Sequence, residues 1–153
     1  MSQSVRLLIF KLDEQSYALR LSAVERIIRA AAVTALPQKP DVVLGVISVH
    51  GHIIPVVDIR KRFRLPEREM QLSDQFILAR TARRTLALLA DSAVGVAELS
   101  EEDVVEAENI VPDLGYIEGA VRIKGEIALI HDLDRFLFPD EEKVLDMSLG
   151  ADG

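Results

Sequence analysis

An internal repeat divides this chain of 153 residues into two similar halves. Residues 45–63 (GVISVHGHIIPVVDIRKRF) align without a gap on residues 119–137 (GAVRIKGEIALIHDLDRFL), and residues 7–21 align more weakly on residues 76–90. The first alignment matches Gly45, Gly51, Ile53, Asp58 and Phe63 with Gly119, Gly125, Ile127, Asp132 and Leu137. Units this small bury little surface alone, so the repeat predicts two similar units packed over a shared apolar interface.

Both repeated segments have the pattern of β-hairpins. Residues 5–12 (VRLLIFKL) precede a charged turn and the run YALRL, and residues 45–57 form two β-branched arms around a glycine. Glycine adopts a positive φ without steric cost, as a tight hairpin turn requires. We therefore expect turns at two equivalent dipeptides, His50-Gly51 and Lys124-Gly125.

Helical signals are short and lie beside the strands. Residues 22–29 (SAVERIIR) fit a short helix with Ser22 as its cap, and residues 139–149 open with a proline and acidic residues. Aspartates end three apolar runs, where a carboxylate accepts a backbone N–H and fixes a turn or the start of a helix. They are Asp58, Asp91 and Asp132.

The chain is expected to form a single domain. Pro66 and a charged cluster interrupt the apolar pattern over residues 64–73. The acidic connector 98–118 is expected to be irregular or partly helical, and residues 148–153 (SLGADG) to be disordered. The predicted boundaries are 4–139 for the domain, about 5–66 and about 72–139 for its halves, and 140–153 for an acidic C-terminal tail.

Charge and composition exclude several classes of function. The net charge is −7, whereas a nucleic-acid-binding protein needs a basic surface to neutralise phosphates. Cysteine is absent, which excludes disulfides, thiolate metal sites and cysteine nucleophiles. No basic leader with a cleavage site opens the chain, and no apolar run reaches the roughly 20 residues of a membrane helix. We therefore expect a cytoplasmic protein without a cofactor and without direct membrane insertion.

Few side chains have a pattern that favours catalysis or metal binding. His50 and His52 have the spacing that puts two side chains on one strand face, but no third ligand lies nearby. His131 and Asp132 are neighbours, and neighbours on a strand point apart, which favours structural roles. A basic stretch is either a docking patch for an acidic partner or a solvated helical face: Arg60, Lys61, Arg62 and Arg64.

The ordered set of motifs resembles the CheW-like domain family over nearly the whole chain. In family order the elements are LLIFKLDEQSYALRL, AVERII, Leu36-Pro37, GVISVHGHIIPVVDIRKRF, LALLADSAVGVAEL, Tyr116 and GAVRIKGEIALIHDLDRFL. The resemblance implies a mainly β fold of two SH3-like five-stranded β-barrels packed together, with short helical turns. It also implies a non-enzymatic adaptor that couples the cytoplasmic tips of chemoreceptors, the methyl-accepting chemotaxis proteins, to the histidine kinase CheA. Such an adaptor belongs to bacterial two-component signalling and is recruited to membrane-associated receptor arrays.

The same resemblance implies two binding surfaces. Leu8, Leu21 and Val24 match family positions that face the kinase. The residues that match the receptor-binding region are Val46, Val49, His50 and Gly51. The family typically reads Asn-Leu-Arg-Gly at the turn, where this chain has Ser48-Val49-His50-Gly51.

Three alternative functions remain open on the sequence. The departure at the receptor-facing turn suits a divergent adaptor of a non-flagellar array, such as one that controls type IV pili. A small barrel also suits oligonucleotide binding, although aromatic residues make up only 5% of the chain and tryptophan is absent. A hydrolase would use His131-Asp132 together with a serine.

Overall fold

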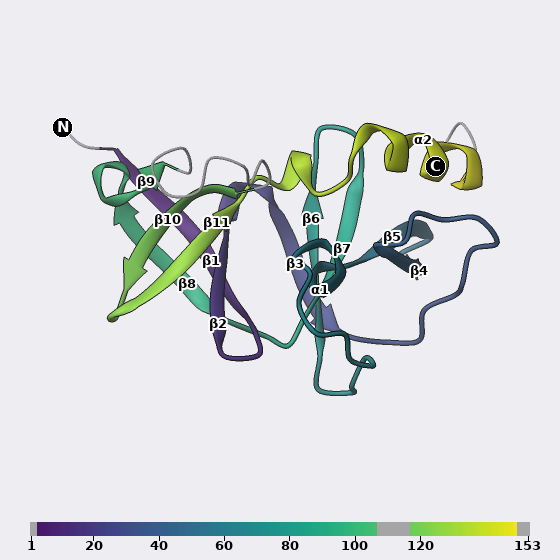
Figure 1. Cartoon of the computed structure of the whole chain (residues 1–153), viewed down its shortest axis with the longest axis horizontal. Coiled ribbons are helices and arrows are strands. Elements are labelled where there is room, and N and C mark those ends of the chain that lie inside the picture. Colours follow the sequence, from purple (N-terminus) through teal and green to yellow (C-terminus); the bar gives the residue numbers. More distant parts are fainter. Residues whose placement is uncertain (1–2, 107–116, 150–153) are drawn as a thin grey trace.

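Two β-barrels pack side by side in the computed structural model, which describes residues 3–106 and 117–149 (Figure 1). The strands are β1 (Ser4–Leu12), β2 (Gln15–Arg20), β3 (Val24–Arg29), β4 (Val43–Val49), β5 (His52–Asp58), β6 (Gln75–Arg80), β7 (Thr85–Ala90), β8 (Ser92–Ser100), β9 (Val105–Glu106), β10 (Ile117–Ile123) and β11 (Glu126–His131). The helices and 3₁₀ turns are η1 (Leu21–Ala23), α1 (Ile59–Arg62), η2 (Glu101–Asp103), η4 (Leu133–Arg135) and α2 (Pro139–Leu149). In the part of the chain described, no helix has the length and apolar character needed to cross a membrane.

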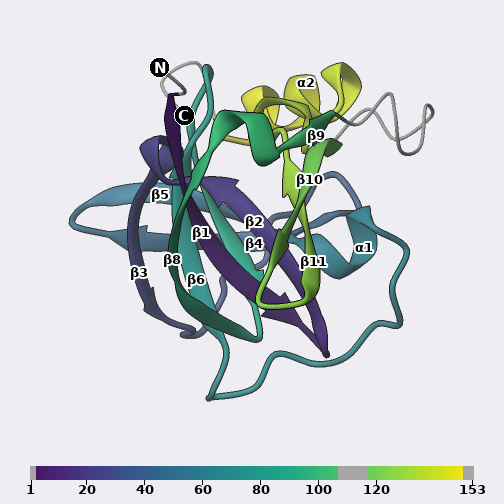
Figure 2. The ribbon, with the colours of Figure 1, turned by 90° about the vertical axis from the view of Figure 1, so that its left-hand side faces the viewer.

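The two barrels are named here by the strands that form them. The terminal barrel has the strand order β8-β1-β2-β11-β10-β9, and the central barrel has the order β3-β6-β7-β5-β4. Only η2 and Val104 separate β8 from β9, so the two strands together take one strand position and the six strands of the terminal barrel occupy five positions. Figure 2 views the molecule from the terminal barrel and shows β8 on one side of β1 and the β10–β11 hairpin on the other. The prediction of two five-stranded barrels is confirmed.

Each barrel takes strands from both halves of the sequence. The first hairpin of the chain, β1–β2, belongs to the terminal barrel, and its repeat equivalent, β6–β7, belongs to the central barrel. The predicted halves 5–66 and 72–139 therefore do not each form a barrel. The physical reason is strand pairing across the halves, because β2 pairs in parallel with β11, and β7 pairs in parallel with β5.

The repeat nevertheless extends to the backbone geometry. Ile130 lies opposite Ala18 in one barrel, and Val56 lies opposite Ala87 in the other, at equivalent positions of the repeat. The two predicted turns are confirmed, and their φ angles match: 49° and 81° at His50-Gly51, 50° and 82° at Lys124-Gly125. The predicted caps are also confirmed, because Asp58 and Asp132 accept the backbone N–H groups of Arg60 and Asp134, respectively.

Strand β3 takes the place of the short helix that the sequence predicts over residues 22–29. The strand pairs antiparallel with β6, from Val24 opposite Ala79 to Arg29 opposite Gln75, and only Leu21–Ala23 form a 3₁₀ turn. β-Branched residues fit a pleated, half-buried surface, and a helix this short has few hydrogen bonds of its own. The prediction of a helix here is wrong because pairing with β6 decides the conformation.

Both faces of β1 are buried, which creates the predicted shared interface. Leu7 and Ile9 point into the terminal barrel, whereas Leu8, Phe10 and Leu12 join a cluster that includes residues of both barrels. The central barrel has a separate interior around Phe76, Leu78 and Val56. Alternation along β1 therefore gives one barrel its interior and the two barrels their common core.

Helix α2 covers part of this common core. Its Leu145 is fully buried in the shared cluster, so the segment expected to begin an acidic tail packs against the barrels. Ser148 and Leu149, which fall in the predicted disordered end, belong to α2, and residues 150–153 lie outside the described residues. In the acidic connector, β8, η2 and β9 occupy residues 98–106, and residues 107–116 again lie outside the described part.

Close backbone contacts at two glycines complete the barrels. Gly45 lies beside the bridge between Thr34 and Val46, and a Cβ atom at Gly45 would lie 2.2 Å from the Thr34 oxygen. At the equivalent Gly119, a Cβ atom would lie 2.6 Å from the Val105 oxygen. Each barrel therefore needs a glycine where the segment after β3, or after β8, crosses the hairpin strand.

Candidate functional site

An apolar strip runs along η1 and β3 at the junction of the barrels. Leu21, Ala23, Val24 and Ile27 pack against the shared core, yet each stays partly exposed. Charged side chains border the strip, including the exposed Arg26. A half-exposed apolar surface with a charged border is typical of a protein-binding site. We call these four apolar residues the β3 strip.

The β4–β5 turn lies next to the β3 strip. His50 and Gly51 are exposed, and Val49 is half-buried. The Nη1 atom of Arg26 lies 2.8 Å from the Nε2 atom of His50. Arginine only donates hydrogen bonds, so Nε2 of His50 accepts this one and the imidazole proton is on Nδ1. The contact joins the turn to β3 and brings the two surfaces that the sequence implies side by side.

Two of the residues assigned to these surfaces are buried instead. Leu8 is 2% exposed in the shared core, because β1 is covered on one face by its own barrel and on the other by the central barrel. Val46 is 8% exposed, because β4 is paired with β5 on one side and with Thr34 on the other. Neither side chain offers much exposed surface to a partner, and the assignment of these two residues to contact surfaces stays a prediction.

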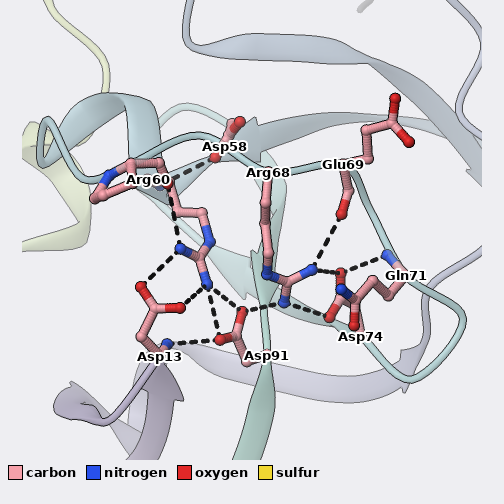
Figure 3. Close-up of polar contacts among 9 residues, drawn as sticks. Asp13, Asp58, Arg60, Arg68, Glu69, Gln71, Asp74 and Asp91 are labelled. Carbon is pink, nitrogen blue, oxygen red and sulfur yellow. Dashed lines mark hydrogen bonds and ion pairs between the residues drawn. The ribbon is translucent and has the colours of Figure 1, made fainter.

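A network of charged side chains joins the two barrels (Figure 3). Arg60 of α1 donates to Asp13 in the β1–β2 turn at 2.9 and 3.0 Å, and to Asp91 between β7 and β8 at 2.9 and 2.8 Å. Arg68 joins Asp91, at 2.5 Å, to the buried Asp74, at 2.8 and 3.1 Å. We call these five residues the clasp. It ties a hairpin of the terminal barrel to the helix and loop that follow β5 of the central barrel.

Electrostatics favour the charged forms of Asp13, Asp91, Arg60 and Arg68. The hydrogen bond from Arg60 is the main reason that the pKa of Asp13 lies below its usual value. Burial acts to raise the pKa of Asp91, but hydrogen bonds from Arg60, from the Asp13 N–H and from Arg68 outweigh burial and lower it. The Arg60 side chain is 6% exposed, so this guanidinium depends on the carboxylates for its solvation.

We expect acid to weaken the fold through the clasp. Asp13 and Asp91 have lowered pKa values in the folded protein, so their stabilising effect is complete at neutral pH. It is lost as the pH falls below the usual carboxylate value of about 4 towards the lowered values. Urea unfolding between pH 7 and pH 3 should give a free energy of unfolding that falls less steeply for Asp91→Asn than for wild type. Equal slopes would contradict this origin of the acid sensitivity.

Two residues of the basic stretch after β5, Arg60 and Arg62, have structural roles and do not form a solvated helical face. Arg60 belongs to the clasp, and Arg62 pairs with Glu141 and lies 3.9 Å above the ring of Phe138. Both arginine side chains are buried, whereas Arg64 is exposed. Two of the four basic residues therefore hold the barrels and α2 together.

The histidines do not assemble a catalytic or metal site. His131 is buried and stacks on Phe63 with ring centroids 4.2 Å apart, while its neighbour Asp132 caps η4. His50 occupies a turn with positive φ, so the alternation that would bring His52 to the same face is broken. Over residues 3–106 and 117–149, no three histidine, aspartate or glutamate side chains lie close enough together to bind a metal ion.

Known proteins are similar to this chain in both fold and sequence. The scaffolding protein TtCheW from Thermoanaerobacter tengcongensis has the same fold, with a TM-score of 0.82 at 23% identity over 88% of this chain and 93% of that chain. The chemotaxis protein CheW of Rhizobium meliloti is 28% identical over 139 residues, which cover 90% of this chain and 89% of the relative. The corresponding protein of Treponema pallidum is 27% identical over 146 residues, covering 92% and 85%.

The fold defines a mainly β domain of paired barrels. A family model described as the CheW-like domain matches residues 6–139. The chain therefore belongs to the CheW-like domain family.

Proposed function

We propose that this protein is a non-enzymatic adaptor that couples chemoreceptor tips to a CheA-type histidine kinase. The observation that carries the proposal is the position of the β3 strip directly beside the β4–β5 turn, on two barrels tied by the clasp. Two neighbouring surfaces on one rigid body let a single small protein contact two partners at once. Membership of the CheW-like domain family, whose curated relatives are named chemotaxis proteins, supports this reading.

The β3 strip is the proposed kinase-binding surface. Leu21 and Val24 are its two most informative residues, because both are apolar, partly exposed and backed by the shared core. The proposed receptor-binding surface is the β4–β5 turn with Val49, His50 and Gly51. Such an adaptor would act in the cytoplasm and join membrane-associated arrays through its receptor partner.

The decisive experiment separates the two surfaces by substitution. Val24→Asp should weaken binding to the kinase at least tenfold, because an unpaired carboxylate buried against an apolar partner costs several kcal/mol. His50→Ala should weaken binding to a receptor cytoplasmic fragment about fivefold, a loss of roughly 1 kcal/mol from removed hydrogen bonding. Each variant should keep the other partner, as measured by titration calorimetry with each partner separately.

The matched control for Val24→Asp is Leu72→Asp, since Leu72 is apolar and 94% exposed but lies away from the strip. Circular dichroism establishes that each variant is folded. If Val24→Asp is folded and binds the kinase as well as wild type does, the β3 strip is not the kinase surface. If it unfolds, Leu21→Asp takes its place in the same titration.

A further inference from the structure

The terminal barrel has an open seam between two of its strands. Strand β8 pairs with β1 on one side, and no described strand pairs with its other side. Strand β10 pairs with β9 only through Gly119 and Ala120, which leaves the outer side of its last residues unpaired within the described chain. Strand edges with free N–H and C=O groups are templates for another extended chain. We call the gap between Val94–Ala97 and Ile123-Lys124 the seam.

The seam opens into a hollow of about 350 Å³. Apolar side chains line most of it, and two lysines and a glutamate stand at its rim: Ile9, Val94, Val96, Ile123, Lys11, Lys124 and Glu126. Val94 and Val96 are 59% and 56% exposed, although large apolar side chains on this chain are mostly buried. The hollow is therefore apolar inside and accessible from solvent.

The equivalent seam in the central barrel is bridged. In the repeat, Ile9 is equivalent to Leu78, and these residues pair with Gly95 of β8 and Arg26 of β3, respectively. Lys124 is likewise equivalent to His50. In the central barrel, Arg26 reaches across to His50. In the terminal barrel, Gly95 has no side chain to make that bridge, so the seam stays open.

The charges at the seam indicate what would fill it. Lys11 lies 3.8 Å from Glu126, whereas Lys124 has no ion-pair or hydrogen-bond partner among the residues described. A lysine without a partner among the described residues, next to an apolar hollow, is a site for one carboxylate beside one apolar side chain.

We propose that the seam binds an extended segment of a partner protein in which an apolar residue stands next to an acidic one. The segment would add to the free side of β8, place its apolar side chain against Val94 and Val96, and pair its carboxylate with Lys124. The bulge at Val94 disturbs the edge there, so backbone pairing is confined to Gly95–Ala97. This surface is distinct from the β3 strip and the β4–β5 turn, and it gives the adaptor a third docking site.

The test is selection from a displayed library of random octapeptides. The library is panned on the wild-type protein after depletion on Val96→Arg, which places a charged side chain beside the free edge of β8. We expect enriched peptides to contain neighbouring apolar and acidic residues. A synthetic peptide of the enriched sequence should bind Lys124→Glu at least tenfold more weakly than wild type. It should bind Lys143→Glu, a charge reversal at an exposed position of α2, as well as it binds wild type. Hydrogen exchange should slow at Gly95–Ala97 when the peptide binds.

Several results would overturn the proposal. These are enrichment of basic peptides, equal binding to Lys124→Glu, or unchanged exchange along β8. A dimer that forms with rising concentration and disappears in Val96→Arg would assign the seam to a second copy of the chain instead. No enrichment above the depleted background would show that the hollow has no extended peptide ligand. Thermal unfolding of Val96→Arg and Lys124→Glu establishes that both variants are folded before the binding results are interpreted.

Discussion

Gly45→Ala should destabilise the protein by about 3 kcal/mol or more, because the methyl group has no room without a backbone shift. The new Cβ atom would lie 2.2 Å from the Thr34 oxygen and 2.8 Å from Cγ1 of Val33. The backbone at Gly45 also has a φ of 154°, which side chains rarely adopt. Relief requires the Thr34–Val46 bridge to open, and that bridge closes the central barrel. Urea unfolding monitored by circular dichroism measures the loss.

Gly125→Ala is the matched control. Gly125 also has a positive φ, 82°, but its added Cβ atom would have no neighbour within 4 Å. The control should therefore cost only the backbone strain of a left-handed residue, about 1 kcal/mol. Equal losses for both variants would show that strain, and not the close contact with Thr34, sets the requirement for glycine at position 45.

Arg60→Met should cost about 3 kcal/mol of folding stability, because the apolar methionine side chain leaves Asp13 and Asp91 without the hydrogen bonds from Arg60. The largest loss of stabilisation is expected at Asp91, since its side chain is 22% exposed and Arg60 contacts both of its oxygens. The variant should also lose much of the acid dependence of the free energy of unfolding. Both quantities come from urea unfolding at pH 7 and pH 3.

Arg64→Met makes the same chemical change at an exposed position four residues away. We expect its free energy of unfolding to stay within about 0.5 kcal/mol of wild type, as for most surface substitutions. If Arg60→Met is as stable as this control, the clasp is a set of solvated ion pairs that contributes little to the junction of the barrels.

Local features of the fold could be read from the sequence, whereas long-range pairing could not. The turns at His50-Gly51 and Lys124-Gly125 and the cap at Asp58 depend on a few adjacent residues, so the pattern predicted them. The exchange of the first hairpins depends on which strands pair. The sequence repeat is the same whether each first hairpin pairs within its own half of the chain or with the other half. Residues 22–29 have a pattern that suits a short helix or a strand, and pairing with β6 decided between them.

The candidate surfaces show the same division. Alternation along β1 predicts that Leu7 and Leu8 point to opposite faces of the strand. It does not predict that a second barrel covers the face of Leu8. The clasp gives no sequence signal, because its members lie at positions 13, 60, 68, 74 and 91 and meet only in the folded chain. By contrast, the adjacency of Arg26 and His50 is the kind of contact that pairs of substitutions in relatives would reveal.

The exchange of hairpins also determines when this chain can finish folding. During synthesis, β3 to β7 emerge together and can close the central barrel, whereas β1 and β2 must wait for β8 to β11. To complete the terminal barrel, the chain must close a loop of more than seventy residues, from Arg20 to Ser92. Contacts between residues so far apart in sequence slow folding. Until then, β1 exposes two apolar faces to the ribosome exit and to chaperones. Strands β1 and β2 are therefore made before the strands of the central barrel but complete their pairing after them.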